Sequence, residues 1–144
     1  MSCGGFKFLE HTADVYLVAS GLSIEEAFEC AAKAMFEVMT DTSKVECVER
    51  VEVSDSCTDV YNCLYRWLED LLVIHDSRNL VFTSFKFKFT SKDGELIRFS
   101  GSACGEHFNP EKHEPRVVVK AVTYSLMKVE QVGNCWYAYV VLDV

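Results

Sequence analysis

The chain has 144 residues, a mass of 16.3 kDa and a formal net charge of −8, because 22 acidic residues outweigh 14 basic ones. This length predicts a single domain over residues 1–144, and the 49% hydrophobic content excludes intrinsic disorder. The acidic balance excludes direct nucleic-acid binding, which needs clustered Lys and Arg, and no apolar run reaches the roughly 20 residues that span a membrane.

The chain begins with two predicted strands. Apolar residues at a two-residue period predict strands over residues 6–9 and 15–19, the second of which ends at Gly21. The polar segment between them, residues 10–14, reads Glu-His-Thr-Ala-Asp and is typical of a turn. Its last residue, Asp14, is the first carboxylate that could take part in chemistry.

Two helices are predicted. A capping box begins at Ser23, and apolar residues at helical spacing follow it, which predicts a helix over residues 24–39. The second helix is expected to start after a cap at Ser56 or Thr58 and to end near residues 75–77.

The remaining pattern is that of strands joined by turns. A hairpin turn is predicted over residues 92–95, and residues 101–116 form the least regular segment. Strands are predicted over residues 46–53, 85–89, 96–99, 117–129 and 135–144. This order predicts an α+β domain, in which two long helices pack on one face of a mainly antiparallel sheet.

The cysteines indicate an intracellular protein. Their number is odd, no Cys-x-x-Cys occurs, and the start lacks the basic and apolar regions of a secretory signal. We therefore expect reduced thiols in a cytoplasmic or nuclear protein rather than a disulfide framework. The seven residues are Cys3, Cys30, Cys47, Cys57, Cys63, Cys104 and Cys135.

The end of the chain carries two carboxylates in succession. Asp143 and the main-chain carboxylate of Val144 follow a strongly apolar strand, which is expected at the centre of a sheet. They are either solvated, as termini often are, or held in place as hard oxygen ligands for Ca²⁺ or Mg²⁺. If Asp14 approached the same end, three carboxylates would meet and would need a cation to stay ionised.

A second group of candidate residues lies in and after the irregular segment. Glu106 and His113 could perform general acid–base work, or they could belong to a polar surface loop. Lys120 lies among valines in a strand that is expected to be central. Because an unpaired buried ammonium is costly, Lys120 either reaches solvent at a sheet edge or pairs with a carboxylate.

Four motifs in order resemble the archease family, and the similarity extends along essentially the whole chain. The last of them lies at the very C-terminus, which makes the set specific although each motif alone is weak. The motifs are residues 8–15, Gly105-Glu106 followed by His113, residues 119–124 and residues 140–144.

The resemblance implies a compact α+β domain that is not an enzyme. It implies an activator that promotes guanylylation of an RtcB-type tRNA-splicing ligase and restores its multiple turnover, in complex with that ligase. The implied metal site is Asp14, Asp143 and Val144, with Ca²⁺ expected first and Mg²⁺ or Mn²⁺ as alternatives. Ligase interaction or activation is implied for Lys120, Glu106 and His113.

Two other functions are compatible with the residues. A small metal-dependent hydrolase or transferase would use Asp14, Glu106 and His113 directly, and would need them around a concave pocket. A general chaperone or adaptor would present a large exposed apolar patch and would be indifferent to the aspartates.

Overall fold

The computed structural model describes residues 3–10 and 14–144. In chain order the described elements are β1 (Gly5–Leu9), β2 (Val15–Gly21), α1 (Ile24–Met39), the short 3-10 helix η1 (Thr42–Lys44), β3 (Glu49–Cys57), α2 (Val60–Arg78), β4 (Leu80–Asp93), β5 (Leu96–His107), β6 (Ala121–Val132) and β7 (Cys135–Asp143).

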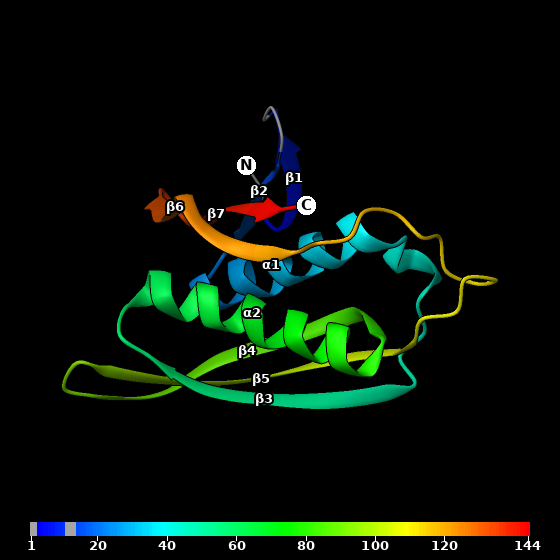
Figure 1. Cartoon of the computed structure of the whole chain (residues 1–144). Coiled ribbons are helices and arrows are strands. Elements are labelled where there is room, and N and C mark those ends of the chain that lie inside the picture. The colour runs from blue at the N-terminus through cyan, green and yellow to red at the C-terminus, as the bar shows by residue number, and fades with distance from the viewer. Residues whose placement is uncertain (1–2, 11–13) are drawn as a thin grey trace.

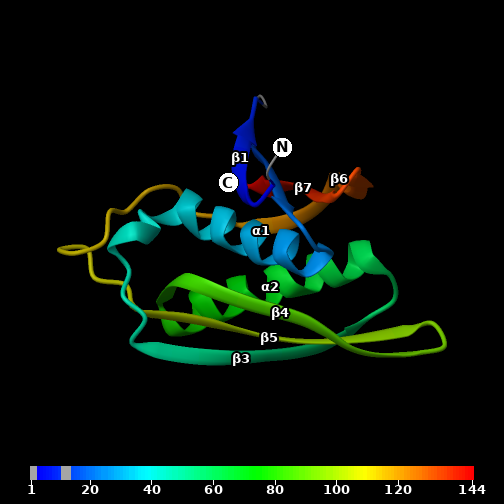
Figure 2. The same cartoon turned by 180° about the vertical axis from the view of Figure 1, so that it is seen from behind.

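In the described part of the chain these elements form two antiparallel sheets with α1 and α2 between them (Figure 1, Figure 2). One sheet has the strand order β1-β2-β7-β6, and the other has the order β3-β5-β4. The predicted α+β class is confirmed, and each sheet has the helices on one of its faces. No helix among the described residues is long and apolar enough to span a membrane.

The chain changes sheet twice. After the β1–β2 hairpin, α1 and η1 lead it to the sheet of β3, β5 and β4. Residues 108–120 carry it back from the end of β5 to β6 (Figure 1). The last strand, β7, then inserts between β2 and β6, so the segment nearest the C-terminus is an interior strand.

The core lies where the helices meet the sheets. Phe28 and Phe36 of α1 and Trp67 of α2 are fully buried, in agreement with the predicted apolar faces. The indole N–H of Trp67 donates to the carbonyl of Phe28 at 3.0 Å, so its buried polar atom has a partner. Phe87 of β4 packs against both Phe28 and Trp67.

The helix boundaries follow from their caps. The Ser23 hydroxyl accepts the Glu26 N–H at 3.0 Å, which confirms the first predicted cap. The cap predicted at Ser56 or Thr58 is wrong, because β3 continues to Cys57 and the carboxylate of Asp59 accepts the Asn62 N–H at 2.8 Å. A carboxylate also suits the positive end of the helix dipole.

The strands of the second half differ most from the prediction. Residues 101–107 continue β5 instead of forming an irregular segment, and residues 117–120 precede β6 instead of belonging to it. β5 passes under α2 here, and a Cβ at Gly101 would lie 2.6 Å from the Trp67 ring. The small residues that this packing requires do not alternate between apolar and polar side chains, so the sequence of this segment shows no strand pattern.

The prediction of reduced thiols is wrong for six of the cysteines in the described part of the chain. Their Cα atoms lie 5.0–5.9 Å apart in pairs, as a disulfide requires, although the partners are 6 to 132 positions apart in sequence. Which cysteines form disulfides depends on their proximity in the fold, and this cannot be predicted from their spacing in the sequence. The bonds are Cys3–Cys135, Cys47–Cys104 and Cys57–Cys63, and Cys30 is free.

Candidate functional site

The chain end is held in place, as its apolar strand predicts. β7 lies between β2 and β6, and its residues Val140 and Leu142 are fully buried. The side chain of Val144 packs against the same core. Asp143 lies between these apolar anchors and is exposed, so its carboxylate faces solvent from a fixed backbone.

Asp14 comes to this end of the sheet through the register of β2 with β7. Val15 pairs with Leu142, so Asp14 and Asp143 occupy the next positions on neighbouring antiparallel strands. Such strands lie about 5 Å apart. The predicted polar turn connects β1 and β2, and its residues 11–13 lie outside the described residues.

Lys120 lies on the other side of Asp143. Ala121 pairs with Asp143, and the Lys120 N–H donates to the Asp143 carbonyl at 2.7 Å. The expectation of a central strand for Lys120 is wrong, because β6 is at the edge of its sheet and starts one residue later. The Lys120 side chain is exposed and forms no ion pair with any described residue, which favours the edge alternative.

These residues fit a hard cation better than a soft one. Asp14 and Asp143 supply carboxylate oxygens, and the main-chain carboxylate of Val144 follows Asp143 directly in the chain. Among the described residues, no three side chains of His, Cys, Asp or Glu come together as a metal group. A third carboxylate from the described residues would have to be the main-chain carboxylate of Val144, and cation binding here stays a prediction.

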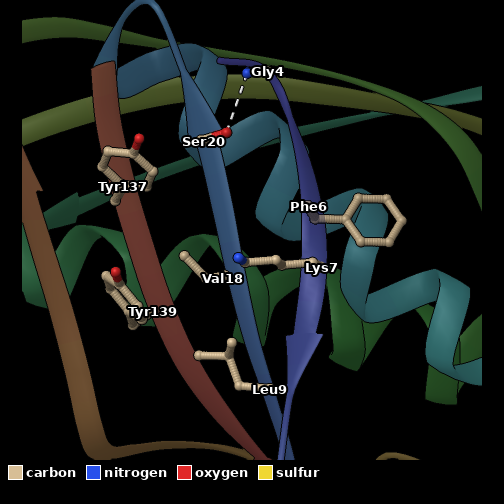
Figure 3. A pocket seen from close by; sticks show the side chains of 8 residues that line it. All are labelled: Gly4, Phe6, Lys7, Leu9, Val18, Ser20, Tyr137 and Tyr139. Carbon is tan, nitrogen blue, oxygen red and sulfur yellow. Dashed lines mark hydrogen bonds between the residues drawn. The ribbon is translucent and has the colours of Figure 1, made fainter. Parts of the chain in front are cut away.

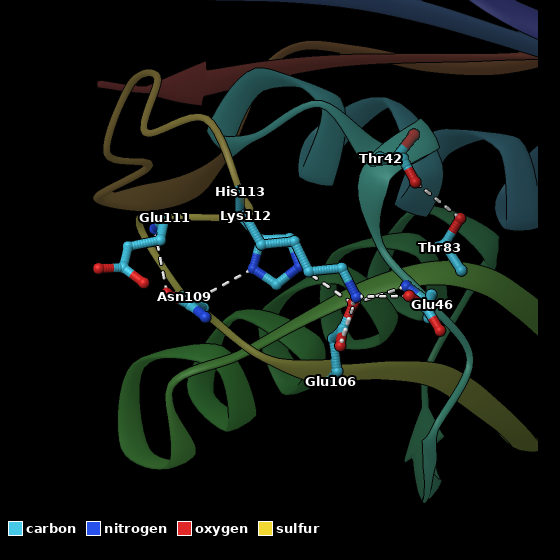
Figure 4. Close-up of polar contacts among 8 residues, drawn as sticks. All are labelled: Thr42, Glu46, Thr83, Glu106, Asn109, Glu111, Lys112 and His113. Atoms are coloured by element: carbon cyan, nitrogen blue, oxygen red, sulfur yellow. Dashed lines mark hydrogen bonds and ion pairs between the residues drawn. The ribbon is translucent and has the colours of Figure 1, made fainter.

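Glu106 and His113 meet in a second cluster, shown in Figure 4. Glu106 lies at the end of β5, and its carboxylate accepts bonds from His113 Nε2 at 3.1 Å and from Lys112 Nζ at 2.8 Å. It also accepts the backbone N–H of Glu46 at 2.7 Å. The Glu46 carboxylate takes a second bond from Lys112 at 2.7 Å, so this ammonium bridges two acids.

The bonding of His113 defines its tautomer. The backbone N–H of Asn109 donates to His113 Nδ1 at 2.9 Å, so Nδ1 must be an acceptor. Nε2 therefore carries the proton and donates it to Glu106. The ring is only 1% exposed, and both of its nitrogens are engaged.

The charges of the cluster stabilise one another. Burial by itself would raise the pKa of Glu106, but hydrogen bonds from Lys112, Glu46 and His113 outweigh it and lower that pKa to about 2. Hydrogen bonds to Glu106 and Glu46 raise the pKa of Lys112. The Glu106 carboxylate and the Lys112 ammonium are therefore both charged over the physiological pH range. Their bonds link the end of β5 to the chain segment that follows it.

Of the second group of candidate residues, Lys120 lies beside the chain end, whereas Glu106 and His113 form a separate cluster. Asp14 directly precedes β2 and Asp143 ends β7 of one sheet, whereas Glu106 lies near the end of β5 in the other. With both nitrogens of His113 engaged and its ring buried, no lone pair is left for a substrate or a metal. This geometry disfavours the hydrolase alternative, which needs Asp14, Glu106 and His113 around one pocket.

Sequence reasoning missed a cavity of about 340 Å³ over β1, β2 and β7, seen in Figure 3. Tyr137, Tyr139 and Lys7 line it, while Ala138 and Val140 between and beside the tyrosines are fully buried. The tyrosines at alternate positions of β7 are the sequence signal that could have predicted this surface. The described residues that line this cavity include no Asp, Glu or His, so they offer no carboxylate or imidazole as a metal ligand.

Comparison with known proteins gives one consistent result. The model of the Archease protein family (MTH1598/TM1083) matches residues 6–144. The chain is 50% identical over 139 residues to "Protein archease" of Sulfolobus acidocaldarius, covering 96% of this chain and 98% of that protein. It is 44% identical over 144 residues to the protein of the same name in Aeropyrum pernix, covering 100% of both.

Solved structures agree with these relatives. The solution structure of Methanobacterium thermoautotrophicum protein 1598 matches with a TM-score of 0.81 and 42% identity, covering 97% of this chain and 99% of that one. The crystal structure of an archease from Thermotoga maritima, described as a possible chaperone, matches with a TM-score of 0.60 and 23% identity, covering 96% of each chain. At this lower identity the second likeness shows the fold alone.

Proposed function

The chain belongs to the archease protein family, and from this membership we propose that it activates an RtcB-type tRNA-splicing ligase without being an enzyme itself. In this proposal it binds the ligase, promotes guanylylation of the ligase and restores multiple turnover. The proposed partner acts on tRNA, so we also propose a cytoplasmic or nuclear location. The three disulfides are compatible with an intracellular location, because intracellular proteins of hyperthermophilic archaea also contain disulfides.

One observation supports this function above the others: the register of β2 with β7 brings Asp14 and Asp143 to neighbouring positions beside the chain end. In the proposal Asp14, Asp143 and the terminal carboxylate of Val144 hold a divalent cation, Ca²⁺ first and Mg²⁺ or Mn²⁺ as alternatives. When bound, the cation would supply positive charge to the triphosphate at the nucleotide pocket of the ligase.

The chain's own residues provide the fixed geometry. The buried side chain of Leu142 and the packed side chain of Val144 hold the backbone on both sides of Asp143. The backbone at Asp143 therefore needs little ordering when its carboxylate meets a partner. The net charge of −8 favours docking to a basic, RNA-binding face, and RNA contacts are left to the ligase.

The test compares Asp14→Asn and Asp143→Asn with Asp93→Asn, an exposed carboxylate in the β4–β5 hairpin that serves as the matched control. We expect Asp14→Asn and Asp143→Asn to lower the rate of ligase guanylylation at least tenfold toward the rate of the ligase alone. The control should stimulate like the wild type, and all three should unfold at the wild-type temperature. Each removes one charge with little change in shape.

The outcomes separate the candidate functions. Full stimulation by Asp14→Asn and Asp143→Asn would reject the carboxylate site and favour the chaperone or adaptor alternative, which is indifferent to these residues. No stimulation by the wild type, measured on a purified RtcB-type ligase, would reject the activator function itself.

A further inference from the structure

Residues 108–120, which we call the strap, join the two sheets without forming a helix or a strand. The strap leaves the end of β5, crosses the C-terminal end of α1 and reaches the start of β6 (Figure 1). Connections of more than about 12 residues without secondary structure are uncommon in compact domains, and most of them are either functional or disordered. This one is ordered by contacts at several points.

Backbone hydrogen bonds connect the strap to the ends of both helices. The N–H groups of Arg116 and Val117 donate to the carbonyls of Met39 and Val38 at 3.1 and 3.2 Å. These carbonyls lie in the last turn of α1, where no helical N–H remains to pair with them. At the start of the strap, the Phe108 N–H donates to the Asn79 carbonyl, just after α2, at 2.8 Å.

The Glu106–His113 pair fastens the strap to β5. His113 is the only ionisable residue among the buried polar residues of the described chain, and it is tied to Glu106 through Nε2 and to Asn109 through Nδ1. If Glu106 were removed, a buried N–H would lose its partner, which costs more than an exposed bond. Glu106 belongs to the sheet of β3, β5 and β4, whereas Asp143 belongs to the other sheet.

The far end of the strap reaches that site. Val119 is buried in the core, and the next residue, Lys120, donates its N–H to the Asp143 carbonyl at 2.7 Å. The strap therefore ends on the backbone of a residue whose side chain is a proposed cation ligand. Pro115, which has a restricted φ, stiffens the path between His113 and Lys120.

We propose that Glu106 and His113 are positioning residues, which act through the strap to set Lys120 and Asp143 at the chain end. This inference deepens the proposed function and rests on it. Because Glu106 anchors His113, the strap has fewer accessible conformations. The hydrogen bond between the Lys120 N–H and the Asp143 carbonyl is then kept, and with it the positions of the carboxylates at the chain end.

The experiment uses Glu106→Gln, which keeps the shape of the side chain, and His113→Ala, which removes the ring. The matched control is Glu46→Gln, because Glu46 also contacts Lys112 through its carboxylate but does not contact the imidazole. Backbone hydrogen exchange of the Lys120 amide is measured by NMR on the full chain. Affinity for Ca²⁺ alone is measured by titration well below the unfolding temperature.

We expect the Lys120 amide to exchange at least tenfold faster in Glu106→Gln and His113→Ala, and Ca²⁺ to bind at least tenfold more weakly. In Glu46→Gln both quantities should stay within twofold of the wild type. The amide of Leu68, a fully buried residue in the middle of α2, reports whether the fold is intact and should exchange at the wild-type rate in every variant.

Three results would overturn or separate the claims. An unchanged Lys120 amide in both variants would show that the pair does not reach the chain end. Faster exchange with unchanged Ca²⁺ affinity would make the pair merely structural. If the wild type binds no Ca²⁺, the proposal of calcium at this site fails, and the Lys120 exchange rates alone decide whether Glu106 and His113 position the chain end.

Discussion

Asp70 illustrates at the residue scale how surroundings set the charge of a side chain. It lies on α2 and faces Asp55 of β3. Burial and the hydrogen bond with Asp55 raise the pKa of Asp70 to about 7, although Arg66 nearby opposes the shift. The two carboxyl groups therefore share a proton at moderately acidic pH, and nothing in the local sequence around Asp70 predicts it.

This pair makes stability depend on pH. An acid whose pKa is 3.8 unfolded and about 7 folded stabilises the protein fully below about pH 3.8, and this contribution is lost as the pH rises through about 7. We expect the wild type to lose roughly 2 kcal/mol, or about 5 °C in unfolding temperature, between pH 5 and pH 8. Asp70→Asn can still donate to Asp55 and should remove most of this loss.

Thermal unfolding of both proteins at the two pH values checks the prediction. Asp76→Asn, an exposed carboxylate later in α2, is the control and should keep the wild-type dependence. An equal loss in Asp70→Asn and in the wild type would contradict the raised pKa.

At the scale of elements, β5 shows why a strand can be invisible to pattern reading. Its second half contains Gly101 and Gly105, and both are there for close packing. A Cβ at Gly105 would lie 1.8 Å from the carbonyl oxygen of Val81 and 2.7 Å from the Cα of Phe82. Both neighbours belong to β4, so they cannot move without breaking the β4–β5 ladder.

Gly105→Ala should therefore be among the most damaging small substitutions in the chain. We expect a loss of more than about 3 kcal/mol in the free energy of unfolding, because the new methyl group overlaps backbone rather than a flexible side chain. Ser100→Ala, in the same strand, should change it by less than about 0.5 kcal/mol. Urea denaturation measures both, and a Gly105→Ala protein as stable as the wild type would contradict the packing described here.

At the scale of the whole molecule, the disulfides constrain the chain over very different distances. Cys3–Cys135 joins positions 132 apart and links the segment before β1 to the start of β7. Cys47–Cys104 spans 57 positions, and Cys57–Cys63 spans 6. In the chain-entropy view, a longer closed loop removes more freedom from the unfolded state.

Removing these bonds should therefore cost stability in the order of their loop lengths. We expect Cys3→Ser to lower the free energy of unfolding by about 4 to 5 kcal/mol and Cys63→Ser by about 2 kcal/mol. Cys30→Ser is the control, since Cys30 is free and Ser can still accept the Gly5 N–H. Thermal unfolding with and without reductant tests the order, and labelling of all seven thiols in the unreduced protein would contradict the pairing.

The sequence alone determined the features that depend on near neighbours in the chain. Helical spacing after the Ser23 cap predicted α1, and the apolar run before Asp143 predicted an interior strand. The α+β class followed from the order of such segments. Both carboxylates of the proposed site, Asp14 and Asp143, were visible as polar residues beside apolar strands.

Only the tertiary structure decided what depends on residues far apart in sequence. The register of β2 with β7 brings Asp14 beside Asp143, and the meeting of Glu106 with His113 buries an imidazole in what looked like a surface loop. The disulfides and the extension of β5 arise in the same way. Local patterns reflect contacts within a turn or a strand, whereas register, burial and pairing come from packing between elements, and for this reason they appear only in the folded chain.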